Sequence, residues 1–225
     1  MMNDCSSQAP EPPRSDLQPP PEHVAARARE IFRLAYLGLT GVIQSVALAV
    51  LVVRVEDTSA HFHFANWVMA AATFLNIALI WNEYVIITIA YYWTTTVLDA
   101  LLPFVLLALQ AFLAHSVYPS ERTWLTALGA LFAAGVVAYA YGFSRIARHP
   151  SDNRDIIRAM GVHRPLTMVF PAIGCGLCWG AALVYDVAGL GHARVAGAIA
   201  GFLLVLAILL RSVPYWRSVT GYAGL

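Results

Sequence analysis

Long runs of apolar residues, separated by short polar segments, dominate the chain from about residue 31 onward. An α-helix needs roughly 20 mainly apolar residues to cross the hydrocarbon core of a bilayer. The runs are continuous, and lipid forces backbone groups to pair within their own segment, so the pattern predicts helices. The predicted spans lie near residues 31–53, 64–84, 92–117, 124–146, 166–187 and 194–213. The expected fold is all-α, a polytopic transmembrane helical bundle of about six spans.

Polar segments frame the predicted transmembrane helical domain, which we expect at residues 23–217. Residues 1–22 are rich in proline and serine and cannot bury a core, so they predict a disordered tail with polyproline character. Residues 147–165 form the only sizeable polar connection between spans. Residues 218–225 follow the last span as a short C-terminal tail.

The division between the second and third spans is weakly marked. No glycine or proline lies between Gly41 and Pro103, so no strong turn signal separates the two spans. The most polar break is Trp81–Tyr84, whose aromatic side chains, with that of Tyr91, suit a membrane interface. Residues 85–90 would then extend either helix or lie in the interface.

The arginines predict the orientation of the bundle. They cluster before the first span, around the connection between spans four and five, and after the sixth span. The opposite connections hold only Arg54, Arg122 and Arg194. Under the positive-inside rule the richer groups face the cytoplasm. We therefore predict an even number of spans, both termini in the cytoplasm and a location in the inner membrane.

Composition narrows the class further. Hydrophobic residues make up 59% of the 225-residue chain and charged residues 12%, against about 25% charged residues in an average soluble domain. The formal net charge of +1 gives no basic field that would attract nucleic acid, and three cysteines are too few for a disulfide scaffold. A soluble globular enzyme is therefore an unfavourable interpretation.

Polar residues within the spans are the strongest functional candidates, because a charged side chain there is costly and is expected to face protein or water. Asp99 is the sharpest of them, since Pro103 one turn later removes a backbone hydrogen bond. A cation or proton pathway is one interpretation, and packing through hydrogen bonds to nearby threonines is the other. The predicted polar seam on spans one to three comprises Asp99, Glu83, Asn76, Thr95, Gln110 and Gln44.

Small residues recur at four-residue spacing in the last three spans and predict close helix packing. Ala134, Ala138 and Gly142 follow this spacing in span four, and Gly197 and Gly201 form a GxxxG motif in span six. The sequence leaves open whether these faces pack within one chain or between the chains of a homo-oligomer.

The large polar connection is expected to contain a short helix between Ser151 and Gly161. Its arginines, Arg148, Arg154 and Arg158, are candidates for docking a cytoplasmic protein partner or anionic lipid headgroups. The alternative is an interfacial linker that only maintains the topology.

No motif in the chain carries a recognisable chemistry. Cys175 and Cys178 form a CxxC motif, but the second cysteine pair of a thiol oxidase and the further ligands of a zinc site are lacking. No histidine pair lies at mid-membrane depth for haem, and there is no Walker loop, GxSxG or HExxH motif. We therefore predict no catalytic residue, cofactor or metal, and do not expect an enzyme.

Three functional hypotheses follow from these observations. The first is a non-enzymatic, homo-oligomeric membrane sensor or membrane subunit that couples to a cytoplasmic partner. The second is a small ion channel or proton-coupled transporter that uses an intramembrane aspartate. The third, a redox enzyme using Cys175 and Cys178, lacks a second cysteine pair for electron exchange.

Overall fold

The computed structural model describes residues 21–91, 96–148, 153–160, 163–188 and 191–223. Regular structure in these residues is helical throughout, which confirms the predicted all-α class. The elements are α1 (Pro21–Thr58), the 3₁₀ helix η1 (Ser59–His61), α2 (Phe64–Ala90), α3 (Val97–His115), α4 (Glu121–Ile146), α5 (Arg154–Met160), α6 (His163–Ala188) and α7 (Gly191–Ala223). Six segments are long and apolar enough to cross a membrane: Ile31–His61, Phe64–Ala90, Val97–His115, Glu121–Ile146, Leu166–Val184 and Val195–Pro214.

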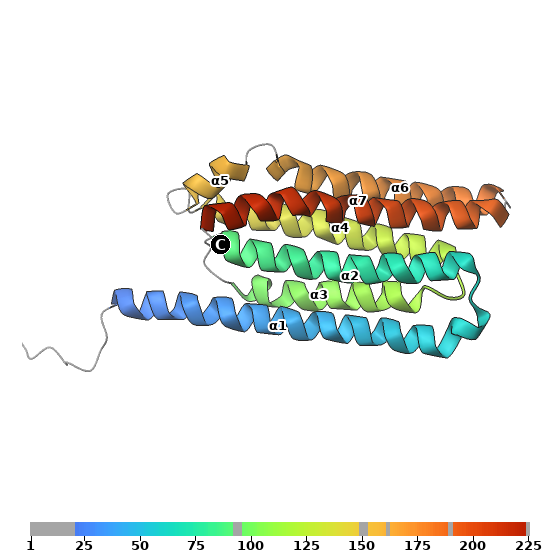
Figure 1. The fold of residues 1–225 in the computed structure, drawn as a ribbon, viewed down its shortest axis with the longest axis horizontal. Helices are drawn as coiled ribbons and strands as arrows, with labels where there is room; N and C mark the ends of the chain where they lie inside the picture. Colours follow the sequence, from blue (N-terminus) through green and yellow to red (C-terminus); the bar gives the residue numbers. More distant parts are fainter. Residues whose placement is uncertain (1–20, 92–95, 149–152, 161–162, 189–190, 224–225) are drawn as a thin grey trace, which may run out of the picture.

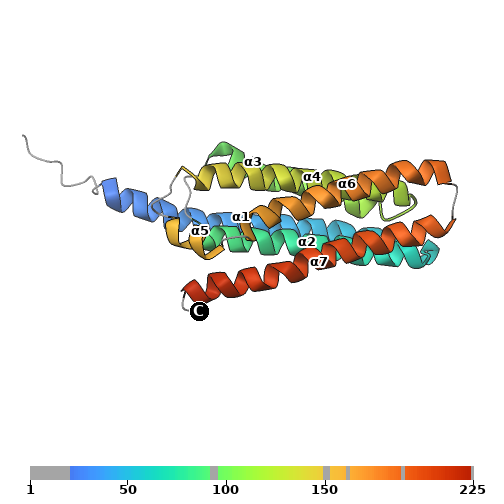
Figure 2. The same cartoon turned by 90° about the horizontal axis from the view of Figure 1, so that it is seen from above.

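The six long helices form a closed ring in the order α1, α3, α4, α6, α7 and α2, as Figures 1 and 2 show together. Each helix packs against both of its neighbours in this ring. Large apolar side chains such as Leu34, Val105 and Leu183 are exposed on the outside of the ring. An outward apolar surface is what a helix bundle in lipid requires, because lipid cannot satisfy polar groups.

Both ends of the described chain lie at the same end of the bundle. Helix α1 begins there, α7 ends there and α5 lies beside them (Figure 1). The arginine-rich end, as we call it, carries Arg33, Arg145, Arg148, Arg154 and Arg158. The opposite end, which we call the far end, carries Arg54 and Arg122. This arrangement agrees with an even number of spans.

Helix α2 is longer than the sequence predicts. It runs without a break through Trp81–Tyr84 and ends at Ala90, so residues 85–90 belong to α2. Tyr84 and Tyr91 are buried rather than exposed at an interface. The prediction of a break at Trp81–Tyr84 is therefore wrong, because polar residues alone do not end a helix when no glycine or proline interrupts it.

Helix α3 correspondingly begins later than predicted. Its first residue is Val97 rather than a residue near 92, and Thr96 occupies the N-cap position. Asp99 therefore lies in the first turn of α3, whereas a span that began near residue 92 would place it about two turns from the start. Threonine is a favoured N-cap residue, and the helix starts where this cap is available.

The other boundaries extend the predicted spans. Helix α1 continues beyond its predicted end to Thr58, and α7 continues to Ala223, so residues 218–223 of the predicted C-terminal tail are helical. Helix α5 lies within the predicted polar connection. The caps predicted for α5 lie outside the described residues, as do residues 1–20 of the predicted N-terminal tail.

The glycines of α7 pack within the same chain. A Cβ atom at Gly201 would lie 2.9 Å from Cη2 of Trp124, and one at Gly197 would lie 3.4 Å from Cδ1 of Leu125. Both neighbours belong to α4. The GxxxG motif of the sixth span therefore brings α7 close to α4 of its own chain.

Candidate functional site

A set of polar side chains on α1, α2 and α3 is buried inside the bundle. The buried set comprises Thr40, Gln44, Thr58, Asn66, Thr73, Asn76, Thr88, Asp99 and Gln110. The hydroxyls of Thr73 and Thr88 donate to backbone carbonyls one turn earlier, over 2.8 and 2.7 Å. The amides and the acid instead contact other helices or a cavity. Thr95 of the predicted seam lies outside the described residues.

One amide pair joins α1 to α3 near the middle of the bundle. Gln110 Nε2 donates to Gln44 Oε1 over 2.9 Å, and the two side chains are 0% and 6% exposed. Gln44 Nε2 and Gln110 Oε1 have no hydrogen-bond partner among the described residues. Because the pair is enclosed and binds itself, its arrangement is that of helix packing by polar side chains.

Buried hydrogen bonds also tie the helices together toward the far end. Trp124 Nε1 of α4 donates to Thr73 Oγ1 of α2 over 3.0 Å. Asn66 Nδ2 donates to the carbonyl of Val117 over 2.8 Å, while Asn66 Oδ1 accepts from the N–H of His63 at the start of α2. Each of these polar groups is therefore used by the fold itself.

Arg54 holds the end of α3 at the far end of the bundle. Its Nε donates to the carbonyl of His115 over 3.2 Å, and its Nη2 donates to the carbonyl of Tyr118 over 2.5 Å. Carbonyls at the end of a helix lack intrahelical donors, so a guanidinium there satisfies them. Arg54 was predicted only as a marker of topology, and the structure gives it this packing role as well.

Asp99 caps its own helix. The N–H and the hydroxyl of Thr96 donate to Asp99 Oδ2 over 2.6 and 2.9 Å. The Thr96 hydroxyl gives its single proton to Asp99, so it accepts from the hydroxyl of Tyr141, 2.7 Å away on α4. Pro103 has no N–H to donate to the Asp99 carbonyl. The hydrogen bonding of Asp99 to a threonine, one of the two predicted interpretations, is thus present.

Glu83 is held among three helices. A side-chain hydrogen bond joins its carboxyl group to the hydroxyl of Tyr139 on α4, and Arg211 of α7 attracts it electrostatically. The Arg211 guanidinium also lies over the ring of Phe170, 5.4 Å from the ring centroid. Glu83 therefore lies inside the bundle near its arginine-rich end.

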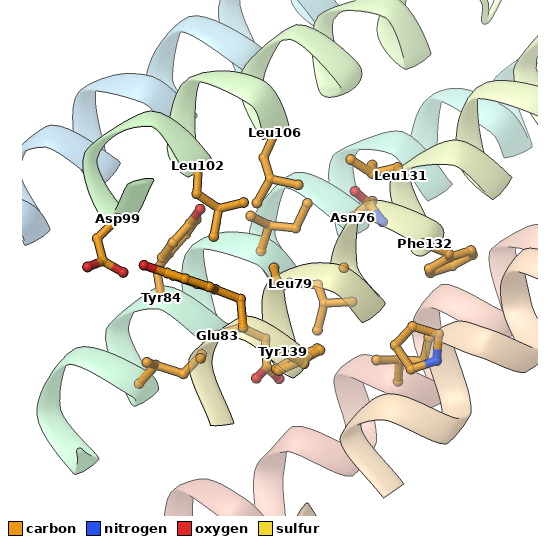
Figure 3. Close-up of a pocket in the computed structure, with 18 of the residues that line it drawn as sticks. Asn76, Leu79, Glu83, Tyr84, Asp99, Leu102, Leu106, Leu131, Phe132 and Tyr139 are labelled. Carbon is orange, nitrogen blue, oxygen red and sulfur yellow. The ribbon is translucent and has the colours of Figure 1, made fainter. Parts of the chain in front are cut away.

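Asp99 and Glu83 line one cavity of about 130 Å³ inside the ring (Figure 3). All six spanning helices contribute to its walls. The contributions include Tyr36 from α1, Asn76 from α2, Leu106 from α3, Leu131 from α4, Pro171 from α6 and Ile208 from α7. Figure 3 shows Asp99 at one end of the cavity and Phe132 at the other, with Asn76 toward the Phe132 end.

The cavity collects residues that the sequence did not place together. Tyr36, Tyr84, Tyr139 and Tyr141 all line it, and the rings of the first two meet edge to face with centroids 5.8 Å apart. Ala138 and Gly142, predicted as packing residues, line the cavity as well, whereas Ala134 packs against the apolar core. No sequence motif marks these tyrosines.

The short helix α5 is anchored to the cavity wall. Asn153, just before α5, donates to the carbonyl of Ile146 at the end of α4 over 3.5 Å. Ile157 of α5 packs against the cluster formed by Ile86, Tyr91 and Ile146. Because Ile146 also lines the cavity, the cavity wall and the cluster that contacts α5 share this residue. Helix α5 carries Arg154 and Arg158.

The candidate docking arginines lie on the surface. Arg148, Arg154 and Arg158 are exposed at the arginine-rich end, around α5. Cys175 and Cys178 are free thiols, and Cys178 lies in the apolar core. Within the described ranges, no group of three or more His, Cys, Asp or Glu side chains is placed to hold a metal ion.

The fold and the six apolar helices define the class: this is a polytopic integral membrane protein. The lipid bilayer is accordingly its immediate environment. Comparison with protein-family models, curated proteins and solved structures finds no match to the chain. Its activity therefore has to be argued from the cavity and its surroundings.

Proposed function

We propose that the protein is a non-enzymatic membrane sensor or membrane subunit that binds a small ligand in the cavity. It acts as a homo-oligomer in the inner membrane and couples the occupancy of the cavity to a cytoplasmic partner. One observation carries this proposal: a single cavity is lined by all six spanning helices. A ligand there contacts every helix, so it can favour one packing of the ring over another.

The route from the cavity to the surface supports the coupling. Ile146 lines the cavity and belongs to the cluster against which Ile157 of α5 packs, and α5 also packs against α6 and α7. A displacement of α4 by a bound ligand therefore moves α5, which carries Arg154 and Arg158. A surface of exposed arginines suits an acidic protein partner, so this end of the bundle is its expected docking site.

An exposed small-residue face supports the homo-oligomer. Gly176 and Gly180 form a GxxxG motif on α6, are exposed, and would meet no atom within 4 Å if a Cβ were added. Such faces allow close helix approach between membrane helices. Gly180→Leu is expected to dissociate the oligomer in size-exclusion chromatography with light scattering, whereas Gly38→Leu, on an open face of α1, leaves it intact.

The coupling is tested by filling the cavity. Gly135 lines it and has no atom within 4 Å of an added Cβ, so Gly135→Leu places an apolar side chain where a ligand would bind. Spin labels at Ile89 and Arg158, in a cysteine-free background, report the distance between α2 and α5 by pulsed electron paramagnetic resonance. We expect a shift of about 1–2 Å, the usual scale of helix movements.

Gly38→Leu is the matched control, because it adds the same side chain outside the cavity. If the leucine does not fit the cavity, Gly135→Val adds the smaller apolar volume and gives the same test. A distance that is the same in the Gly135 variants and the control would overturn the proposed coupling.

A small ion channel or proton-coupled transporter is the second candidate, because two intramembrane acids, Asp99 and Glu83, line the same cavity. Asp99→Asn keeps an oxygen that can accept from Thr96 but removes the charge. In liposomes this variant should abolish cation or proton flux, while Glu56→Gln, on the exposed far end of α1, should not. Equal flux in both variants would remove Asp99 from the pathway.

A further inference from the structure

The cavity is the size of a small aromatic molecule. Its volume is about 130 Å³, and an apolar cavity of about 150 Å³ is known to hold benzene. Leu79, Leu102, Leu106 and Leu131 form apolar parts of its walls. A ligand of this site therefore needs an apolar body close to the size of one benzene ring.

The acids among the lining residues favour positive charge in the cavity. Asp99 and Glu83 are the two carboxyl groups among the described lining residues, and Arg145 is the one guanidinium. Arg211 attracts Glu83 from outside the lining and is itself stacked over Phe170. The lining acids thus outnumber the lining base, and a carboxylate in an apolar site is stabilised by a cation placed beside it.

The cavity is also rich in aromatic surface. Tyr36, Tyr84, Tyr139 and Tyr141 come from three helices and all line the cavity. An ammonium group is attracted by tyrosine rings as well as by carboxylates, and aromatic side chains are a recurrent feature of ammonium-binding sites. A metal cation would instead favour several oxygen ligands, so this mixture of rings and acids fits an organic cation.

One end of the cavity offers an acceptor that the protein does not use. Asn76 is 2% exposed and lines the cavity, and its Oδ1 atom has no hydrogen-bond partner among the described residues. Leaving a buried acceptor without a donor is costly, and most buried polar groups in proteins are paired. A donor on the ligand would satisfy this atom.

The spacing of the two polar ends sets the length of the ligand. Asn76 and Glu83 lie on the same face of α2, seven residues and therefore about 10 Å apart along the helix axis. In Figure 3 Asp99 lies at one end of the cavity, Asn76 lies toward the other end, and Glu83 lies between them. A molecule that reaches both ends has its cation and its donor on opposite sides of the apolar body.

We infer that the cavity binds a small lipophilic primary ammonium whose far end carries a hydroxyl donor. The ammonium lies between Glu83 and Asp99 beside the tyrosines, and the hydroxyl donates to Asn76. This inference rests on the proposed function, in which the cavity is the ligand site of the protein. It names the chemical class of the ligand, which the coupling test does not use.

Tyramine has this arrangement of groups and serves as the probe. Binding of tritiated tyramine to the full chain in nanodiscs is measured by scintillation proximity, with empty nanodiscs to subtract partition into lipid. Phenethylamine lacks only the hydroxyl, and tyrosol replaces only the amine by an uncharged hydroxyl. We expect saturable binding of tyramine. Compared with unlabelled tyramine, phenethylamine should compete about threefold to tenfold more weakly, and tyrosol at least tenfold more weakly.

Two variants test which residue binds each end of the ligand. Asn76→Leu should erase the preference for tyramine over phenethylamine while phenethylamine still binds, which shows that the variant is folded. Glu83→Gln should weaken both amines at least tenfold and leave tyrosol unchanged. Glu56→Gln, exposed at the far end, is the charge-matched control and should bind like the original chain.

The outcomes separate this inference from the proposed function. Tyrosol that competes as well as tyramine, or the absence of saturable tyramine binding, overturns the ligand class even if Gly135→Leu moves α5. Tyramine binding with the expected selectivity but without movement of α5 overturns the sensor and leaves the ligand class standing.

Discussion

The two halves of the ring use buried polar side chains in different ways. Toward the far end, Trp124 donates to Thr73 and Asn66 donates to Val117, so polar groups are paired by the chain itself. In the half that contains the cavity, Asn76 lines the end of that cavity away from Asp99 and keeps an acceptor with no partner among the described residues. The difference teaches that an unpaired polar atom beside a cavity marks a functional candidate more directly than burial of a polar residue alone.

Packing differs between the two halves as well. Trp124 and Leu128 are fully buried and approach Gly201, so α7 and α4 are in close contact. In the cavity half, Gly135 and Gly142 have open space where a side chain could lie. In lipid, van der Waals packing and not the hydrophobic effect drives helix association, so close contact stabilises the far half and the cavity weakens the other.

The largest effect is expected from adding a side chain where α7 and α4 are already in close contact. In Gly201→Leu, the new side chain meets Trp124 at 2.9 Å, and Trp124 is fully buried and hydrogen-bonded to Thr73. Because the indole ring of Trp124 cannot move aside, we expect a loss of about 3 kcal/mol in the free energy of unfolding. Unfolding in mixed micelles by steric trapping measures it.

Gly135→Leu is the comparison for that variant, since it adds the same side chain in the cavity half. It should unfold with a free energy equal to or above that of the original chain. If both variants lose the same stability, the two halves are packed alike and the comparison fails.

The sequence was sufficient to predict the fold class, because a chain in lipid needs apolar helices long enough to span the bilayer. Runs of apolar residues long enough to span a bilayer predicted six helices, and the same rule predicted that Gln44, Asn76 and Gln110 face inward. The start of α3 was missed although its signal is present: Thr96 and Asp99 have the spacing of a capping box. Local hydrogen bonding decided that boundary, and hydropathy alone does not contain it.

The cavity itself was beyond prediction from the sequence. It exists because Gly135, Ala138 and Gly142 leave space that the neighbouring helices do not fill. The spacing of small residues predicted close packing there and also at Gly197 and Gly201, where α7 approaches α4. Whether a small-residue face is filled or left open depends on which helix lies opposite, and a single sequence does not specify that partner.

An intermediate effect is expected at the boundary between the halves. Gln110→Leu removes the donor to Gln44 Oε1. Both polar atoms of the buried Gln44 amide are then unpaired. We expect a loss of about 1 kcal/mol in the free energy of unfolding. The double variant Gln44→Leu/Gln110→Leu removes both amides, so it should recover to within about 0.5 kcal/mol of the original chain. A double variant that loses as much as the two single variants added together would show that the amides do not act as a pair.

The smallest and most informative effect is expected at Asn76. The sign of the change in unfolding free energy there distinguishes the two halves. Asn76→Leu removes an acceptor that the chain does not satisfy and adds apolar volume toward the cavity. We therefore expect a gain of about 0.5 kcal/mol in the free energy of unfolding, together with the loss of hydroxyl selectivity described above. Asn66→Leu is the matched change in the far half and should lose about 1–3 kcal/mol, because it breaks the bonds to Val117 and His63. A loss at Asn76 as large as that at Asn66 would mean that Asn76 serves the fold, and its amide would no longer mark a binding site.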